Sequence, residues 1–174
     1  MENKQIINPP LIEPQGKDHY FVFIIVLICS IIFNMFFFQL AVVKGDSMYP
    51  TLKNGQLLIV NKIASTDTYE RGDILICDVN GTKIIKRLIA LPNETIQIID
   101  NDIYINNEKI PDFIDVQMED YGYLSSPLTL QEDEYVLMGD NRNNSLDSRS
   151  FGQVKEQNII GKVVFRFLPL STTF

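Results

Sequence analysis

A long apolar run dominates the pattern of hydrophobic and polar positions near the N-terminus. No charged residue occurs from Tyr20 to Val43, and the residues before this run are polar and rich in proline. Twenty-four helical residues extend about 36 Å, which exceeds the hydrocarbon thickness of a bilayer, about 30 Å. The pattern therefore predicts a short disordered tail over residues 1–19 and a single transmembrane helix over residues 20–43.

A cleavable signal peptide is the alternative interpretation of this run. Its apolar core would be only about 7–15 residues long and would end in a small-x-small cleavage site. The run is longer than that and ends in Leu40-Ala41-Val42-Val43. Lysines lie on both sides of it, so the positive-inside rule does not indicate which end faces the cytoplasm.

Beyond Leu52 the pattern changes to short apolar segments separated by polar turns, and Asn80-Gly81 is a strong hairpin signal. No later stretch has helical periodicity over ten residues, and Pro111–Glu134 is acidic and loop-rich. Residues 44–174 therefore predict one all-β domain, curled or barrel-like. The predicted strands are Gln56–Ile63, Asp73–Val79, Thr82–Leu91, Thr95–Ile99, Ile103–Ile105, Glu134–Met138 and Ile159–Leu168.

Charge and composition exclude several classes of function. The net charge of −7 argues against a nucleic-acid partner, which requires a basic face. Cys29 falls in the apolar run and Cys77 is alone in the predicted domain, so no disulfide is expected within the domain. Two separated cysteines and one histidine, His19, do not form a metal-ligand pattern, and no cofactor is indicated. Because His19 precedes the apolar run, a Ser-His-Asp triad in the domain is excluded as well.

A candidate nucleophile follows the apolar run. Ser47 lies in Lys44–Leu52, between Gly45 and Asp46 and three residues before Pro50, a composition typical of a turn. A turn exposes a serine hydroxyl more readily than the interior of a helix or strand. An ordinary structural turn is the competing interpretation.

A candidate base occurs on the predicted strand Thr82–Leu91. With a period of two, Lys86 shares a face with Ile84 and Leu88, whereas Lys83 and Arg87 point to the other side. Burial on an apolar face should lower the pKa of Lys86 from about 10.4, toward the range of about 7–8 that suits a general base. A neutral lysine can accept a proton from a serine hydroxyl. A lysine that extends from a half-buried strand to water is the alternative.

The loop Gly139–Arg149 is the third polar feature. Its glycine, Asx, serine and arginine residues cannot build a core, so it is either a solvated loop or a hydrogen-bonded network. Asp147 and Arg149 are two residues apart and could pair. Ser145 could orient a lysine amine.

Together these motifs resemble those of the bacterial type I signal peptidases, a family of membrane-anchored Ser/Lys endopeptidases. The similarity covers nearly all of the chain after the apolar run, with the motifs in the same order. The matching stretches are Gly45–Leu52, Arg71–Ile74, Ile84–Pro92, Gly139–Arg149 and Gly161–Phe167.

This resemblance implies a role for each candidate residue. Ser47 would be the nucleophile and Lys86 the general base that later protonates the leaving amine. Ser145 would orient the lysine, and Asp147 with Arg149 would form the ion pair that holds the site.

The resemblance also implies how the oxyanion is bound. The backbone N–H of Ser47 would donate to it. One branch of the family has a hydroxyl residue two positions before the nucleophile as a further donor. Gly45 occupies that position here, which matches the Gram-positive-like branch and leaves the second donor open.

The implied substrates are secretory preproteins, cleaved after a small-x-small motif as the signal sequence leaves the bilayer. The implied location is the cytoplasmic membrane, with the N-terminal tail in the cytoplasm and an antiparallel β catalytic domain on the outer face. Two alternatives remain: another Ser/Lys processing peptidase of related fold, or a catalytically degenerate, membrane-anchored β module that only binds a partner.

Overall fold

The computed structural model of the protein describes residues 17–63 and 69–167. The chain divides into two compact units, Met1–Phe36 and Phe37–Phe174. The first contains nearly all of helix α1 (Lys17–Phe37). The tail expected over residues 1–19 lies outside the described residues except for its last three, which begin α1. Among the described residues, no helix combines the length and apolar character needed to cross a membrane.

The end of the predicted transmembrane helix requires a correction. The helix was expected to continue to residue 43, but α1 ends at Phe37 and Phe38–Val42 forms strand β1. Strand β1 pairs with β2 (Leu57–Asn61) in an antiparallel register that runs from Phe38 opposite Asn61 to Val42 opposite Leu57. A continuous apolar run cannot by itself distinguish a helix from a strand, and this distant pairing partner decides the outcome.

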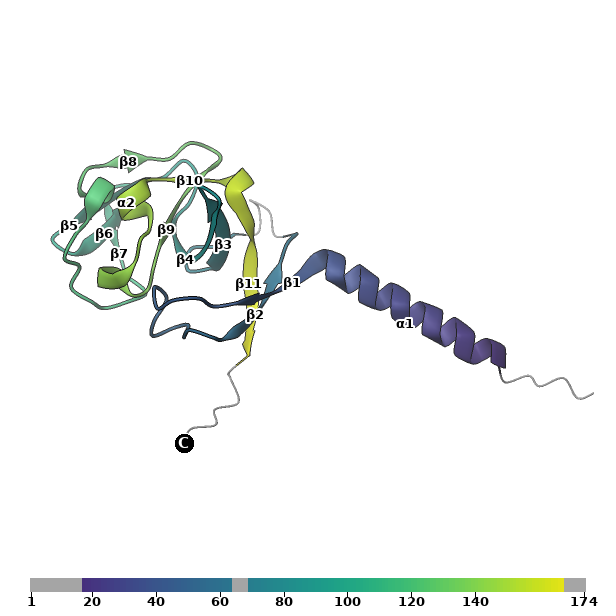
Figure 1. The fold of residues 1–174 in the computed structure, drawn as a ribbon. Coiled ribbons are helices and arrows are strands. Elements are labelled where there is room, and N and C mark those ends of the chain that lie inside the picture. The colour runs from purple at the N-terminus through teal and green to yellow at the C-terminus, as the bar shows by residue number, and fades with distance from the viewer. Residues whose placement is uncertain (1–16, 64–68, 168–174) are drawn as a thin grey trace, which may run out of the picture. The chain divides into compact units, whose positions relative to one another are not determined.

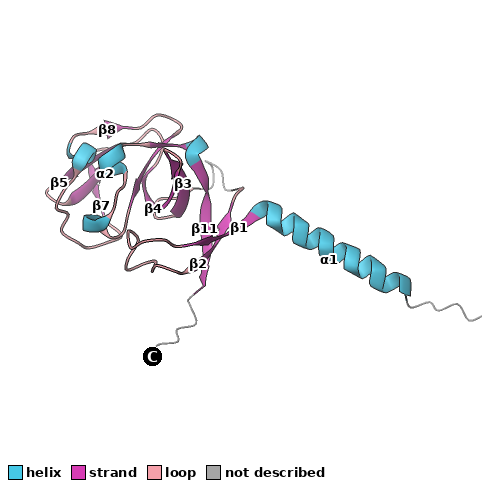
Figure 2. Cartoon of the chain, viewed as in Figure 1, coloured by secondary structure: helices cyan, strands magenta, loops and turns pink. Residues whose placement is uncertain are grey.

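The second unit is mainly β, as the magenta ribbon in Figure 2 shows. Its short helices are α2 (Ser148–Phe151) and the 3₁₀ turns η2 (Gly122–Ser125), η3 (Arg142–Asn144) and η4 (Glu156–Asn158). Its other strands are β3 (Ile74–Val79), β4 (Thr82–Ala90), β5 (Thr95–Ile99), β6 (Asp102–Ile105), β7 (Glu108–Ile110), β8 (Leu128–Thr129), β9 (Glu134–Met138), β10 (Val154–Lys155) and β11 (Ile159–Phe167).

The strands form two antiparallel sheets. Within the described part of the chain, a seven-stranded sheet has the order β1-β2-β11-β3-β4-β9-β10, and a four-stranded sheet has the order β7-β6-β5-β8. The predicted hairpin at Asn80-Gly81 joins β3 to β4, and both turn residues have positive φ. In Figure 1 the last strand, β11, lies among strands formed much earlier in the chain. The mainly antiparallel β architecture is confirmed.

Three apolar clusters hold the unit together. One packs the four-stranded sheet against the end of β4 and β9. The second lies around Leu75, Leu88 and Leu137 in the large sheet. The third consists of Val43, Met48, Leu52 and Leu58, and it anchors the turn that follows β1.

Candidate active site

The turn that contains Ser47 is fixed by the burial of its apolar neighbours. Met48 and Leu52 are almost completely buried, whereas Ser47 is half-buried. Backbone hydrogen bonds close the turn, from Tyr49 N to the Asp46 carbonyl (3.0 Å) and from Leu52 N to the Met48 carbonyl (2.8 Å). Burial of these two apolar side chains therefore fixes the turn, while Ser47 stays partly exposed.

Gly45 enters the same turn with a φ of +83°, a left-handed conformation that favours glycine. Its N–H donates to the side chain of Asn54 at 3.1 Å. Gly45 thus shapes the turn, but it does not line the pocket described below.

Lys86 lies on β4 with only 3% of its surface exposed. Its Nζ donates to Ser145 Oγ at 2.9 Å. Burial lowers the pKa of Lys86 below its usual value, while the negative charge of Asp147 acts in the opposite direction. The lysine is therefore held in the environment that favours a neutral amine, as the strand pattern predicts.

Ser145 connects Lys86 to an ion pair. Burial alone would raise the pKa of Asp147, but hydrogen bonds from Arg149, the Gly139 N–H and Ser145 hold that pKa below its usual value. Arg149 Nε and one of its terminal nitrogens each donate to Asp147 at 2.9 Å. The loop is thus a satisfied network, with Asp147 fully buried.

The Gly139–Arg149 loop also contacts the Ser47 turn directly. Asn141 N donates to the Ser47 carbonyl at 3.0 Å, and Asn141 Nδ2 donates to the Asp46 carbonyl at 3.1 Å. A Cβ atom on Gly139 would lie 2.0 Å from Ser145 Oγ and 2.6 Å from the Ser47 carbonyl oxygen. Glycine is therefore required at position 139 so that the two segments can approach each other. Sequence reasoning singled out this loop but not these two residues.

Arg87, the neighbour of Lys86, holds the opposite face of β4. Its guanidinium donates to both carboxylate oxygens of Asp140, at 2.8 and 2.6 Å. It also donates to the carbonyl of Gly72 at 2.8 Å and to the Thr51 hydroxyl at 3.3 Å. Sequence analysis placed Arg87 on this face but assigned it no partner, because Asp140 lies in a distant loop.

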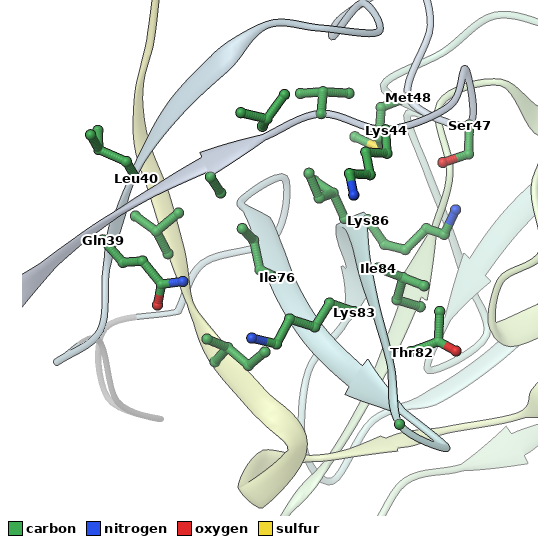
Figure 3. A pocket seen from close by; sticks show the side chains of 17 residues that line it. Gln39, Leu40, Lys44, Ser47, Met48, Ile76, Thr82, Lys83, Ile84 and Lys86 are labelled. Atoms are coloured by element: carbon green, nitrogen blue, oxygen red, sulfur yellow. The ribbon is translucent and has the colours of Figure 1, made fainter.

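A cavity of about 690 Å³ is lined by both Ser47 and Lys86. Its walls are mostly apolar and come from β1, the Ser47 turn and the first half of β4. Figure 3 shows Ser47 and Lys86 at the same end of this pocket, with the lysine amine directed toward Ser47. Among the described residues the Lys86 amine donates to Ser145, and it forms no hydrogen bond with the Ser47 hydroxyl.

This arrangement has the components of an acid–base site without a metal ligand set. The Ser47 hydroxyl and the buried Lys86 amine line one apolar pocket, and the Ser145 hydroxyl, which is not part of its lining, accepts from that amine. Within the residues that the structure describes, no group of three or more His, Cys, Asp or Glu side chains could hold a metal ion. Cys77 lies on the neighbouring strand β3 opposite Ile84 and is buried, and its burial raises the pKa of that thiol to about 12.

Comparison with known proteins gives consistent results. The model of the family described as signal peptidase, peptidase S26, matches residues 17–168. Signal peptidase I T of Bacillus subtilis (strain 168) is 35% identical over 160 residues, which cover 85% of this chain and 83% of that protein. Signal peptidase I of Bacillus amyloliquefaciens is 35% identical over 158 residues, 84% of this chain and 82% of that protein.

A crystal structure of a signal peptidase I from Enterococcus faecalis V583 is also similar. It shares 32% sequence identity with a TM-score of 0.47, and the alignment covers 55% of this chain and 97% of that one. The family match spans most of the sequence, and the relatives align over most of their own length. The chain therefore belongs to the signal peptidase family, peptidase S26.

Proposed function

We propose that this protein is a signal peptidase I, a serine endopeptidase that removes signal peptides from secretory preproteins with a Ser47/Lys86 dyad. The observation that supports this most directly is the buried Lys86 amine, held by Ser145 at 2.9 Å in the pocket that Ser47 also lines. A lysine with a lowered pKa is suited to take a proton from a serine hydroxyl near neutral pH.

In the proposed reaction, neutral Lys86 accepts the hydroxyl proton as Ser47 Oγ bonds to the scissile carbonyl carbon. The negative charge moves to the carbonyl oxygen, where the backbone N–H of Ser47 is the proposed donor. The C–N bond then breaks, and the Lys86 ammonium gives its proton to the departing amine. Water, deprotonated by Lys86, hydrolyses the acyl-enzyme and restores the serine.

The pocket suits a peptide substrate in an extended conformation. Strand β1 is an end strand of the large sheet, so its outer edge is free among the described residues. Strand β9 pairs only with Arg87–Ala90 of β4, which leaves Thr82–Lys86 open on that side. Both open edges line the pocket. An extended chain between them would gain backbone hydrogen bonds, and the apolar lining would accept the small side chains of a small-x-small site.

An apolar sheet face supports activity close to a bilayer. One row of this face crosses β1, β2 and β11 and consists of Leu40, Ile59 and Phe165. The next row on the same face contains Val42 and Phe167. The β1 and β11 residues of this set are exposed. Exposed apolar patches of this kind are typical of interaction surfaces, and we place this one against lipid.

The uncharged segment Tyr20–Phe37 is the proposed membrane anchor of the enzyme. Large apolar side chains such as Phe21, Phe23 and Phe33 are exposed on α1, as on a helix that contacts lipid. By analogy with the family, the residues before the helix would lie in the cytoplasm and the β unit on the outer face. Flotation with lipid vesicles tests whether the segment anchors the chain in a membrane, and a chain left in the soluble fraction contradicts the proposed anchor.

Cleavage of a preprotein in detergent tests the activity. The wild-type chain should cut a preprotein with a small-x-small site and spare one with bulky residues there. Ser47→Ala and Lys86→Ala should abolish cleavage without loss of the β circular dichroism spectrum. Lys86→Arg should also be inactive, because a guanidinium stays protonated.

The variants distinguish the remaining possibilities. Undiminished cleavage by Ser47→Ala or Lys86→Ala would refute the dyad. Wild-type chain that binds but never cleaves a preprotein would favour the binding-module function. Cleavage of a non-secretory substrate alone would favour another Ser/Lys processing peptidase.

A further inference from the structure

The segment between β7 and η2, residues 111–121, crosses the Gly139–Arg149 loop without regular secondary structure. The sequence predicts that it belongs to the acidic, loop-rich stretch Pro111–Glu134. Its backbone is held by side chains from elsewhere: Asn101 accepts from Met118 N at 2.7 Å and donates to the Val116 carbonyl at 3.2 Å. Met118 is the buried anchor of the segment. The segment is therefore a defined structure with fixed contacts.

Its strongest contact with the catalytic loop is an ion pair. Both terminal nitrogens of Arg142 donate to the two carboxylate oxygens of Asp112. The Arg142 side chain is completely buried, whereas 18% of the Asp112 side chain is exposed. Arg142 Nε also donates to the Gly139 carbonyl at 3.1 Å. Arg142 thus links the segment to the glycine that packs against Ser145.

Further hydrogen bonds extend this contact along the loop. Asn143 Oδ1 accepts from Glu119 N at 3.0 Å, and its amide nitrogen donates to the Gln117 carbonyl at 2.9 Å. Arg149, the partner of Asp147, donates to the Asp120 carbonyl at 3.2 Å. The loop residues on both sides of Ser145 are therefore attached to the same segment.

A second contact reaches the strand that contains the base. Phe113 lies against the guanidinium of Arg87, with 5.2 Å between the arginine Cζ and the ring centroid. The same ring packs on Gly72, where a Cβ atom would come within 2.6 Å of it. Because Arg87 is adjacent to Lys86, the segment contacts both the loop that bears Ser145 and the strand that bears the lysine.

We propose that the 111–121 segment sets the position of Ser145 relative to Lys86, and that Asp112 is its principal positioning residue through the buried pair with Arg142. This inference rests on the proposed peptidase function. The 2.9 Å bond between Lys86 and Ser145 requires both partners to be held in place. Without Asp112, the buried Arg142 charge would be unpaired, which is costly, so the side chain would move toward solvent or another acceptor. The loop that starts at Gly139 would shift with it.

The test compares Asp112→Asn with Asp115→Asn in the full-length enzyme, using a preprotein as substrate. Asp115 is an exposed acid in the same segment that has no hydrogen bond or ion pair among the described residues. Displacement of Ser145 should reduce kcat by about ten- to hundredfold, with KM changed by less than about twofold because the substrate pocket is not altered. Asp115→Asn should match the wild type.

A double variant separates positioning from general destabilisation. If Asp112 acts through Ser145, Asp112→Asn combined with Ser145→Ala should be about as slow as the slower single variant. Multiplication of the two effects would overturn the proposal, as would an unchanged kcat in Asp112→Asn. Should Asp112→Asn fail to fold, Asn143→Ala, which removes two exposed contacts of the same segment, should show the same interdependence with Ser145. Absence of cleavage by wild-type protein would instead refute the peptidase function.

Discussion

Replacement of Ser145 by alanine removes the hydrogen-bond acceptor of the Lys86 amine. That bond is 2.9 Å long in the structure. In the proposed reaction it becomes charge-assisted when the lysine takes the Ser47 proton, so it is stronger in the transition state than in the ground state. Hydrogen bonds to charged groups contribute about 1.5–3 kcal/mol. Since about 1.4 kcal/mol is tenfold in rate, kcat should fall by about ten- to hundredfold at constant KM.

Single-turnover cleavage of a preprotein in detergent measures this effect across a range of pH. The wild-type rate should rise with pH as Lys86 loses its proton. Because the bond to Ser145 favours the ammonium form, its loss should lower the pKa of Lys86 further, and the rising limb should move to lower pH. Thermal unfolding of the variant reports whether the fold is intact.

Ser148→Ala is the matched control for this experiment. Ser148 is in the same loop and is fully buried, but its Oγ accepts from Leu137 N at 3.0 Å and not from the lysine. Its removal should lower stability by about 1–3 kcal/mol and leave kcat nearly unchanged. An unchanged kcat in Ser145→Ala, or equal losses of kcat in both variants, would refute the assigned role of Ser145.

Two further substitutions test the environment of the site. Lys86→Met should inactivate the enzyme and raise its stability by about 1–3 kcal/mol at neutral pH, because it removes a buried amine. The folded state depresses the pKa of Lys86, so the wild-type protein takes up a proton when it unfolds at a pH between the folded and unfolded pKa values. The stability of the wild type therefore rises with pH in that range, and the stability difference between Lys86→Met and the wild type should shrink. Denaturant titrations at several pH values measure this, and a pH-independent difference would contradict it. Gly139→Ala places a Cβ atom 2.0 Å from Ser145 Oγ, and should lower both kcat and stability, the latter by about 1–3 kcal/mol. Gly161→Ala is the control, because its Cβ atom would lie 2.4 Å from the Asn61 carbonyl oxygen and would not meet Ser47, Lys86 or Ser145. It should destabilise the fold while the folded fraction keeps its kcat. Equal kcat values for the two alanine variants would be evidence against this account.

Local patterns predicted most of the strands because their signals lie within a few residues. The bounds of β5 (Thr95–Ile99) and β9 (Glu134–Met138) agree with the predicted ones. The positive φ values that Asn and Gly adopt readily made the β3–β4 hairpin recognisable. Strand β1 was missed because it continues the uncharged apolar run without a break, and it is defined by pairing with β2, a partner nearly twenty residues away.

The residues of the candidate site also differ in whether their signals are local in the sequence. Ser47 and Lys86 could be proposed as site residues because a turn composition and a two-residue alternation are local properties, and both residues line the same pocket. Asp112 could not, since an acid in a polar loop has no distinguishing neighbour and its partner Arg142 is thirty residues away. The contact of Asn141 with the Ser47 carbonyl is likewise set by tertiary structure alone.

That contact between Asn141 and Ser47 has a consequence for the biogenesis of the enzyme. The proposed nucleophile, Ser47, lies near the start of the β unit, whereas its supporting loop lies near the end, and strand β11 is then inserted between β2 and β3. A nascent chain therefore contains the serine and the lysine long before it can assemble the dyad. A protease built in this order stays inert until its supporting loop and strand β11 have been synthesised and folded.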